Sequence, residues 1–172
     1  MNPDLQPLFA RRSIRRYTDE PVTTDQMHDL LEAAMAAPSA CAKDPWRFVV
    51  VRQRDMLKAI AAGLPNGGML AEAAVGVIVC GDMEAAHDGA ESYMLQDCSA
   101  AIENLLLAAS MLGLGACWLG VHPRADRVEL IREKLGLPAT VVPVSAIAVG
   151  QPADQPEART RYDADYVHHE RW

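Results

Sequence analysis

Four arginines and one serine stand close together near the start of the chain. Residues 11–17 read Arg-Arg-Ser-Ile-Arg-Arg-Tyr, which places four of the sixteen lysines and arginines in one segment of a chain with a formal net charge of −7. A guanidinium presents a planar fork of donors that matches phosphate oxygens, and the Ser13 hydroxyl adds another donor. The spacing is chemically suited to a phosphate monoester; the alternatives are a solvated basic face, which is common for basic runs, a nucleic-acid contact or a kinase recognition site.

The composition indicates one globular domain. A length of 172 residues, half of them hydrophobic, is typical of a single domain with a sizeable core. A pI near 5.1 argues against nucleic acid as a partner. The N-terminus shows no pattern of a secretory signal, so we expect a cytoplasmic protein. Residues 98–121 are apolar, but Glu103, Asn104 and several glycines interrupt them, so we expect no membrane partner.

Cysteines and histidines do not suggest a metal site. Cys41, Cys80, Cys98 and Cys117 are far apart in the sequence and include no Cys-x-x-Cys pair, which favours buried, reduced thiols. The histidines show no ligand spacing with cysteines or carboxylates. A Gly-x-Gly-x-x-Gly turn and a Walker-type loop are also absent from the sequence. We therefore expect neither a bound metal nor the usual dinucleotide fold.

Alternating helices and strands must position the basic segment. A first short helix is expected to begin at Asn2 or Asp4 and to deliver the segment at its end. Thr23 and Gln26 have the spacing of a capping box, and apolar residues then recur at helical intervals until Pro38. We further expect strands at 47–52, 75–80, 117–121 and 141–149, helices at 54–63, 93–112 and 127–135, and a turn at 64–68.

Three further segments carry their own expectations. Pro143 predicts that the last strand is an edge strand or contains a bulge. Residues 81–92 are polar between two apolar elements and form either a substrate lid or an ordinary loop. The segment 151–172 is polar, yet it contains three aromatic residues. Linkers rarely carry aromatic side chains, so this tail is expected to dock onto another surface.

Several fragments, taken in order, resemble one protein family. The basic segment is followed by Ala37-Pro38-Ser39-Ala40, by Pro45-Trp46-Arg47-Phe48, by 112–120 with its three glycines, by Val149-Gly150-Gln151-Pro152 and by a late Arg161. Over nearly the whole chain this order resembles the nitroreductase family of FMN-dependent oxidoreductases. The resemblance implies an α+β fold, with a mixed, mostly antiparallel sheet around a long central helix. It also implies an intertwined homodimer, with residues 1–150 as the FMN-binding domain and 151–172 as a tail that embraces the partner.

The resemblance also implies roles for individual residues. Arg11, Ser13 and Arg161 are expected to hold the FMN phosphate. Arg15 is expected near the ribityl chain and the pyrimidine edge, where a fixed positive charge stabilises a reduced flavin. Arg12 is expected to contact the flavin through its backbone. Contacts from the second subunit are expected from Pro38, Ser39 and Ala40. A peptide N–H near flavin N5 is expected at Leu119 and Gly120.

Two positions depart from the family's pattern. The family commonly has Asn and Gln where this chain has Ala42 and Asp44. Ala42 cannot form a hydrogen bond through its side chain, and Asp44 would bring a carboxylate near a cofactor that gains negative charge on reduction. Alternatively, Asp44 caps the turn before Pro45 or pairs with Lys43 or an arginine.

The implied activity is that of an NAD(P)H-dependent FMN oxidoreductase. In a ping-pong reaction, NADH or NADPH transfers hydride to flavin N5, and the flavin then reduces a nitroaromatic, quinone or activated-alkene acceptor in the same pocket. The cofactor supplies the chemistry, so we expect no catalytic side chain. The alternatives are a non-enzymatic flavin-binding or sensing protein, and a specialised branch of the family that is dehalogenase-like or destroys its own flavin.

Overall fold

A four-stranded antiparallel sheet forms the centre of the protein. The structure is a computed structural model that describes residues 2–172. The strands are arranged in the order β1-β2-β4-β3, and all three pairings are antiparallel. An isolated bridge between Ser13 and Ala116 adds a parallel contact at the β3 edge. The strand bounds are Trp46–Val51 (β1), Val75–Asp82 (β2), Gly115–Gly120 (β3) and Val141–Gly150 (β4).

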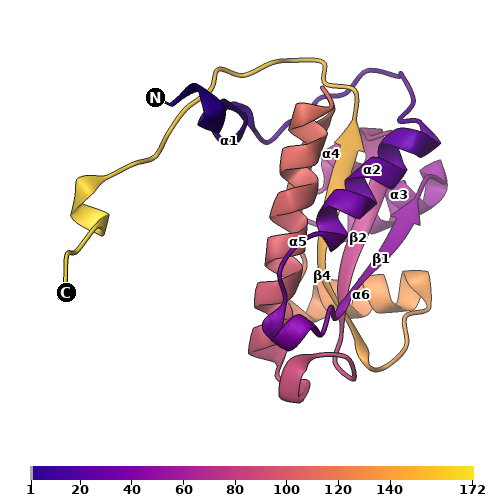
Figure 1. Cartoon of the computed structure of the whole chain (residues 1–172). Helices are drawn as coiled ribbons and strands as arrows, with labels where there is room; N and C mark the ends of the chain where they lie inside the picture. Colours follow the sequence, from indigo (N-terminus) through magenta and orange to yellow (C-terminus); the bar gives the residue numbers. More distant parts are fainter. Residues whose placement is uncertain (1) are drawn as a thin grey trace.

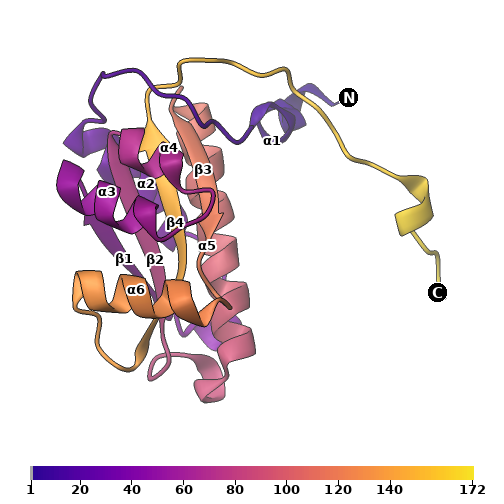
Figure 2. The same ribbon diagram turned by 180° about the vertical axis from the view of Figure 1, so that it is seen from behind.

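Helices cover both faces of this sheet, as Figures 1 and 2 show from opposite sides. The helices α2 and α5 pack on one face, and α3, α4 and α6 pack on the other. The arrangement confirms an α+β fold in which a long helix lies along the sheet. The helix bounds are Gln6–Ala10 (α1), Thr24–Met35 (α2), Arg54–Ala62 (α3), Gly68–Glu72 (α4), Glu91–Met111 (α5) and Ala125–Leu135 (α6).

The alternation of side chains along the strands produces two cores. Successive residues of a strand point to opposite faces of a sheet. On β2, Val77 and Val79 join the core beneath α2 and α5, while Ile78 and Cys80 join the core beneath α3, α4 and α6. The burial of both faces explains why the strand sequences are almost continuously apolar.

Local sequence signals account for the two helices on the first face. The Thr23 hydroxyl accepts a hydrogen bond from the Gln26 backbone N–H at 3.1 Å, and the Gln26 side chain accepts one from the Thr23 N–H at 3.0 Å. This is the expected capping box at the start of α2. Helix α5 is apolar around most of its circumference because it packs against both the sheet and α2.

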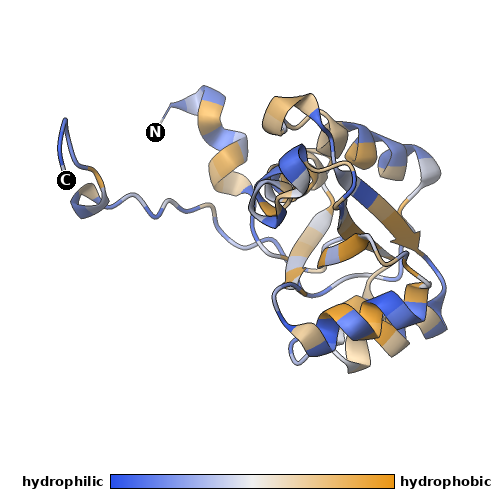
Figure 3. Cartoon of the chain, turned by 90° about the horizontal axis from the view of Figure 1, so that it is seen from below, coloured by the Kyte–Doolittle hydropathy of each residue, from blue (hydrophilic) through white to orange (hydrophobic). Residues whose placement is uncertain are grey.

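The tail that follows β4 passes close to the N-terminal helix α1 and then leaves the body of the protein. After β4 the chain passes α1, where the Arg159 N–H donates to the Phe9 carbonyl at 3.2 Å. It then extends away from the body as a mainly hydrophilic segment (Figures 1 and 3). Tyr162 and Tyr166 are 76% and 81% exposed, and Trp172 is fully exposed. The tail aromatics therefore find no docking surface within one chain.

Several expectations about the elements need correction. Pro143 does lie at a bulge, where the register shifts between Val79 and Cys80, but the edge-strand prediction is wrong because β4 lies between β2 and β3. The bulge accommodates a residue that has no N–H to donate. Cys41 is exposed rather than buried, since it lies in a surface loop. Within residues 2–172, no helix is both long and apolar enough to cross a membrane.

Candidate functional site

The basic segment is fixed between β3 and the start of the tail. The Ile14 N–H donates to the Ala116 carbonyl at 3.0 Å, and the Thr18 N–H donates to the Gln151 carbonyl at 2.9 Å. The Tyr17 hydroxyl lies 2.7 Å from the Ile14 carbonyl oxygen. A Cβ on Gly115 would lie 2.7 Å from the Ile14 side chain, so only glycine permits this close approach. The arginines therefore project from a backbone that is tied to the sheet.

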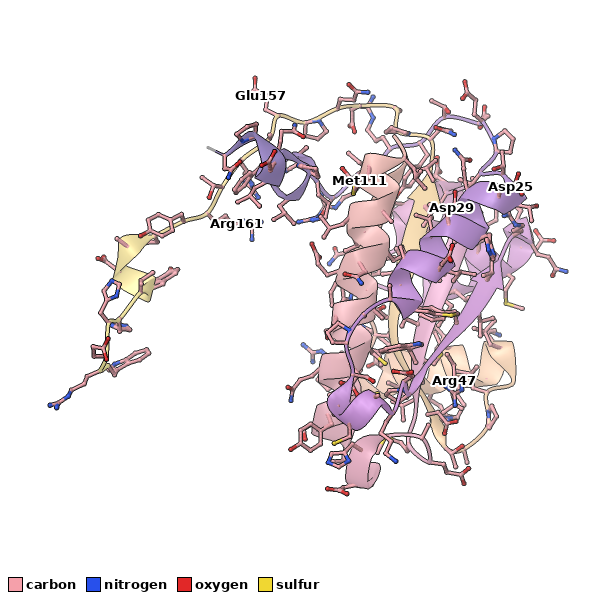
Figure 4. All side chains as sticks on the ribbon, viewed as in Figure 1. Asp25, Asp29, Arg47, Met111, Glu157 and Arg161 are labelled. Atoms are coloured by element: carbon pink, nitrogen blue, oxygen red, sulfur yellow. The ribbon has the colours of Figure 1, made fainter. Side chains whose placement is uncertain are left out.

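Basic side chains from both ends of the chain line one hollow, which we call the basic hollow. It has a volume of about 280 Å³. The structure thus brings Arg161 to Arg11 and Ser13, as the sequence predicted, and Figure 4 shows Arg161 on the tail beside α1. Arg159 also lines it, a residue that sequence reasoning missed. The complete lining is Leu8, Arg11, Arg12, Ser13, Arg15, Arg159 and Arg161.

The arginines of the basic hollow differ in what they already contact. Arg11 forms an ion pair with Glu103, with 3.1 Å between Nε and Oε1. Arg12 donates to the backbone carbonyl of Glu157. In the described part of the chain, Arg159 and Arg161 form no ion pair. An anion therefore finds these two guanidinium groups, like that of Arg15, without a competing carboxylate.

A second and larger hollow of about 610 Å³, the wide hollow, shares Arg15 with the basic hollow. Leu119 and Gly120 line it, as expected of residues that lie against a flavin ring. A Cβ placed on Gly120 would meet no atom within 4 Å, so the backbone there is open to the hollow. The other lining residues are Leu64, Pro65, Asn66, Gly68, Met69, Cys117, Trp118 and Arg127.

Two polar residues of the wide hollow were missed from the sequence. Asn66 lies in the segment that was interpreted as a simple turn. Arg127 lies on α6, where many charged residues gave no reason to select one of them. One Arg127 N–H donates to the Gly120 carbonyl at 2.8 Å, and its buried Nε has no hydrogen-bond partner. Their spatial convergence on Gly120 could be recognised only in the folded chain.

The loop 38–44 does not reach either hollow within one chain. The Ala40 N–H donates to Oδ1 of the buried Asp97 on α5 at 2.9 Å, which holds the loop at a different part of the molecule. Pro38, Ser39, Ala40, Ala42 and Asp44 are therefore not brought to Arg15, Leu119 or Gly120. A contact between this loop and a ligand in the hollows requires a second copy of the chain.

The geometry of Asp44 matches the turn-capping alternative. Its carboxylate oxygen lies 2.5 Å from the Ser39 hydroxyl, and its N–H donates to the same hydroxyl at 3.0 Å. Cys41, Ala42 and Asp44 all have left-handed backbone angles, with φ of 51°, 52° and 49°. Such angles are unfavourable for residues other than glycine and persist only where surrounding contacts enforce them. The hydrogen bonds that Ser39 and Asp97 form with this loop hold these backbone angles.

The buried thiols are not reactive groups of this site. Burial raises the pKa of Cys80 and of Cys98 to about 12. Burial also raises the pKa of Cys117, against an opposing effect of the nearby Arg15 charge. These three cysteines therefore stay protonated near neutral pH. In the part of the chain that the structure describes, no carboxylate or histidine lines the wide hollow, so its chemistry has to come from what it binds.

Together the two hollows fit the two ends of a flavin mononucleotide. The basic hollow offers arginine donors and the Ser13 hydroxyl to a phosphate, and the wide hollow offers open backbone and apolar walls to a planar ring. Arg15 lies between them because it lines both. The set of donors fits the cofactor that the sequence suggested.

Comparison with known proteins gives consistent matches. The profile of the Nitroreductase family matches residues 8–67 and 61–151. A protein of Archaeoglobus fulgidus with the provisional name NADH dehydrogenase/NAD(P)H nitroreductase is 42% identical over 98% of this chain and 98% of its own length. The FMN reductase [NAD(P)H] of Bacillus subtilis is 32% identical over 99% of this chain and 74% of its own length.

A solved structure extends the match to three dimensions. It is a provisional nitroreductase of Desulfovibrio desulfuricans in complex with FMN, 36% identical to this chain, with a TM-score of 0.84. The alignment covers 100% of this chain and 99% of that structure. The shared fold thus accommodates FMN in a protein of nearly the same extent.

Proposed function

Because the chain belongs to the nitroreductase family, we propose that it reduces nitroaromatic, quinone or activated-alkene acceptors in a ping-pong reaction. It is an NAD(P)H-dependent oxidoreductase, and FMN is its cofactor. When bound, FMN supplies the hydride transfer, and the protein supplies position, charge and exclusion of water. The acceptor class and the order of the steps are the proposal.

One observation carries this proposal: Arg15 joins a basic hollow to a wide hollow. Arg11, Ser13 and Arg161 bind the phosphate, and Arg159 adds a fourth donor group. The flavin ring lies against Leu119 and Gly120 in the wide hollow, whose remaining space takes the nicotinamide and the acceptor in turn.

The residues around the ring act by charge and position. The Arg15 guanidinium favours negative charge at the pyrimidine edge, because a preorganised cation stabilises charge that develops next to it. The open backbone at Gly120 lets a peptide group approach the ring. Arg127 holds the Gly120 carbonyl in place. None of these residues has to exchange a proton.

We also propose that two chains complete the site. The loop 38–44 and the wide hollow lie apart within one chain, and the aromatic residues of the tail are exposed. In a homodimer, the tail 151–172 packs on the partner, and Pro38, Ser39 and Ala40 of one chain cover the flavin held by residues 1–150 of the other. Ala42 and Asp44 belong to the same covering loop.

Rapid mixing tests the proposed function directly. The purified chain should carry FMN, and NADH or NADPH should bleach the visible absorption of the oxidised flavin. Adding a quinone or nitroaromatic acceptor should restore the absorption. A flavin that stays oxidised with both nucleotides would refute the enzyme and favour a flavin-binding or sensing protein.

A further inference from the structure

Among residues 2–172 of one chain, the lining of the wide hollow includes two arginines and no acidic side chain. We propose that its acceptors are aromatic acids, in which a carboxylate or sulfonate on the reducible ring is bound by Arg127. This inference rests on the proposed function and specifies its substrate class. It explains a cationic pocket in a chain whose net charge is −7.

Arg127 has donors that the protein does not satisfy. Its Nε is buried and has no hydrogen-bond partner, and among residues 2–172 it forms no ion pair with a carboxylate. Only the bond from its NH1 to the Gly120 carbonyl, at 2.8 Å, is made within the chain. The second terminal nitrogen, NH2, forms no hydrogen bond within residues 2–172, and Arg127 lines the wide hollow. Because a guanidinium binds carboxylates through charge-assisted N–H bonds, this end of the side chain is available to an anionic ligand.

The position of Arg127 favours the acceptor over the cofactor as the source of that anion. Arg15 lies where the two hollows meet and serves the cofactor. Arg127 comes from α6 and contacts Gly120, the residue expected beside the reactive part of the flavin ring. An anion on Arg127 thus lies next to the place where acceptors react.

The walls near Arg127 suit an aromatic body. Trp118 is 38% exposed, and Met69 and Leu64 line the same hollow. An aromatic ring gains burial and stacking against such side chains. The combination of an apolar wall and one unpaired guanidinium selects a planar molecule with a single acidic group.

Paired acceptors that differ only in charge test the inference. We call kcat/KM for 4-nitrobenzoate divided by kcat/KM for nitrobenzene the acceptor ratio. This ratio should fall at least about tenfold in Arg127→Gln, because one charge-assisted interaction is lost. Arg127→Lys keeps the charge and should restore part of the ratio. Arg124→Gln is the matched control, since Arg124 is an exposed arginine at the start of the same helix and lies outside the hollow. It should leave the ratio as in the wild type.

A binding experiment supplies a readout that does not depend on turnover. Benzoate binding to the FMN-loaded protein, measured by calorimetry, should weaken by a similar factor in Arg127→Gln and should weaken in the wild type as salt is added. Both proteins are saturated with FMN for this measurement, because Arg127 also holds the Gly120 carbonyl beside the ring.

Distinct outcomes separate the possible failures. Equal acceptor ratios in wild type and Arg127→Gln would overturn the inference, as would equal benzoate affinities of the two FMN-loaded proteins. A change in the NADPH to NADH preference with constant acceptor ratios would also overturn it. A wild-type chain that binds no FMN would refute the proposed function and this inference with it.

Discussion

Replacing Arg161 with alanine should weaken FMN binding much more than riboflavin binding. The two ligands share the ring and the ribityl chain, and only FMN has the phosphate. Arg161 lines the basic hollow and forms no ion pair within residues 2–172, so its charge is available to the phosphate. By contrast, Arg11 is already paired with Glu103 at 3.1 Å.

The size of the effect follows from this difference. A hydrogen bond to a charged group contributes about 1.5 to 3 kcal/mol, and each 1.4 kcal/mol changes an equilibrium constant about tenfold. Arg161→Ala should therefore raise the Kd for FMN by about 10- to 100-fold. Arg11→Ala should have a smaller effect, because the Nε of Arg11 is already engaged by Glu103 and only its remaining donors are available to the phosphate.

Titration of apoprotein with each flavin, followed by fluorescence, measures both constants. Arg171→Ala is the matched control, since Arg171 lies in the same tail but does not line the hollow. The FMN effect in Arg161→Ala should also shrink as salt is added. Equal losses for FMN and riboflavin would show that Arg161 acts through the fold of the tail, and the phosphate assignment would be wrong.

Three further changes test the rest of the site. Gly120→Ala should leave the melting temperature of the apoprotein unchanged, because its Cβ would meet no atom within 4 Å, but should weaken FMN binding in a titration. Spectroelectrochemistry should find a higher FMN midpoint potential in Asp44→Asn and a lower one in Arg15→Gln, each by tens of millivolts at most. An unchanged potential in Asp44→Asn would make Asp44 only a turn residue. Truncation after Gln151 should abolish FMN binding and dimer formation together, and sedimentation of the intact protein as an FMN-bound monomer would reject the proposed dimer.

Local signals in the sequence predicted most of the elements. The capping box of Thr23 and Gln26 placed the start of α2, and the apolar stretch after Tyr93 predicted α5 to within two residues at its start. The bulge at Pro143 followed from its missing N–H. The sequence could not choose between a bulge and an edge position, because strand order depends on contacts between distant segments, which single residues do not encode. Helix α4 was missed because Gly67 and Gly68 favour a turn.

The sequence predicted the site residues that belong to family motifs. It did not predict the residues that reach the site only through folding. Arg11, Ser13 and Arg161 were selected from the sequence, and they do line one hollow. Arg159 and Arg127 stand in charged surroundings, so nothing in the sequence distinguishes them from solvated residues. The separation of the loop 38–44 from the hollows became visible only in the structure.

The composition of the basic hollow has a consequence for how the protein is made. Its donors come from residues 8–15 and from 159 and 161, so the hollow cannot exist until nearly the whole chain has been synthesised. The sheet, which needs only residues 46–150, is available earlier. If FMN binds in the basic hollow as proposed, cofactor capture follows the synthesis of the tail and is a late event in biogenesis. A ligand that binds only the assembled hollow stabilises that assembly by mass action. Scarcity of flavin in the cell should then expose the chain ends to proteases while the sheet stays intact.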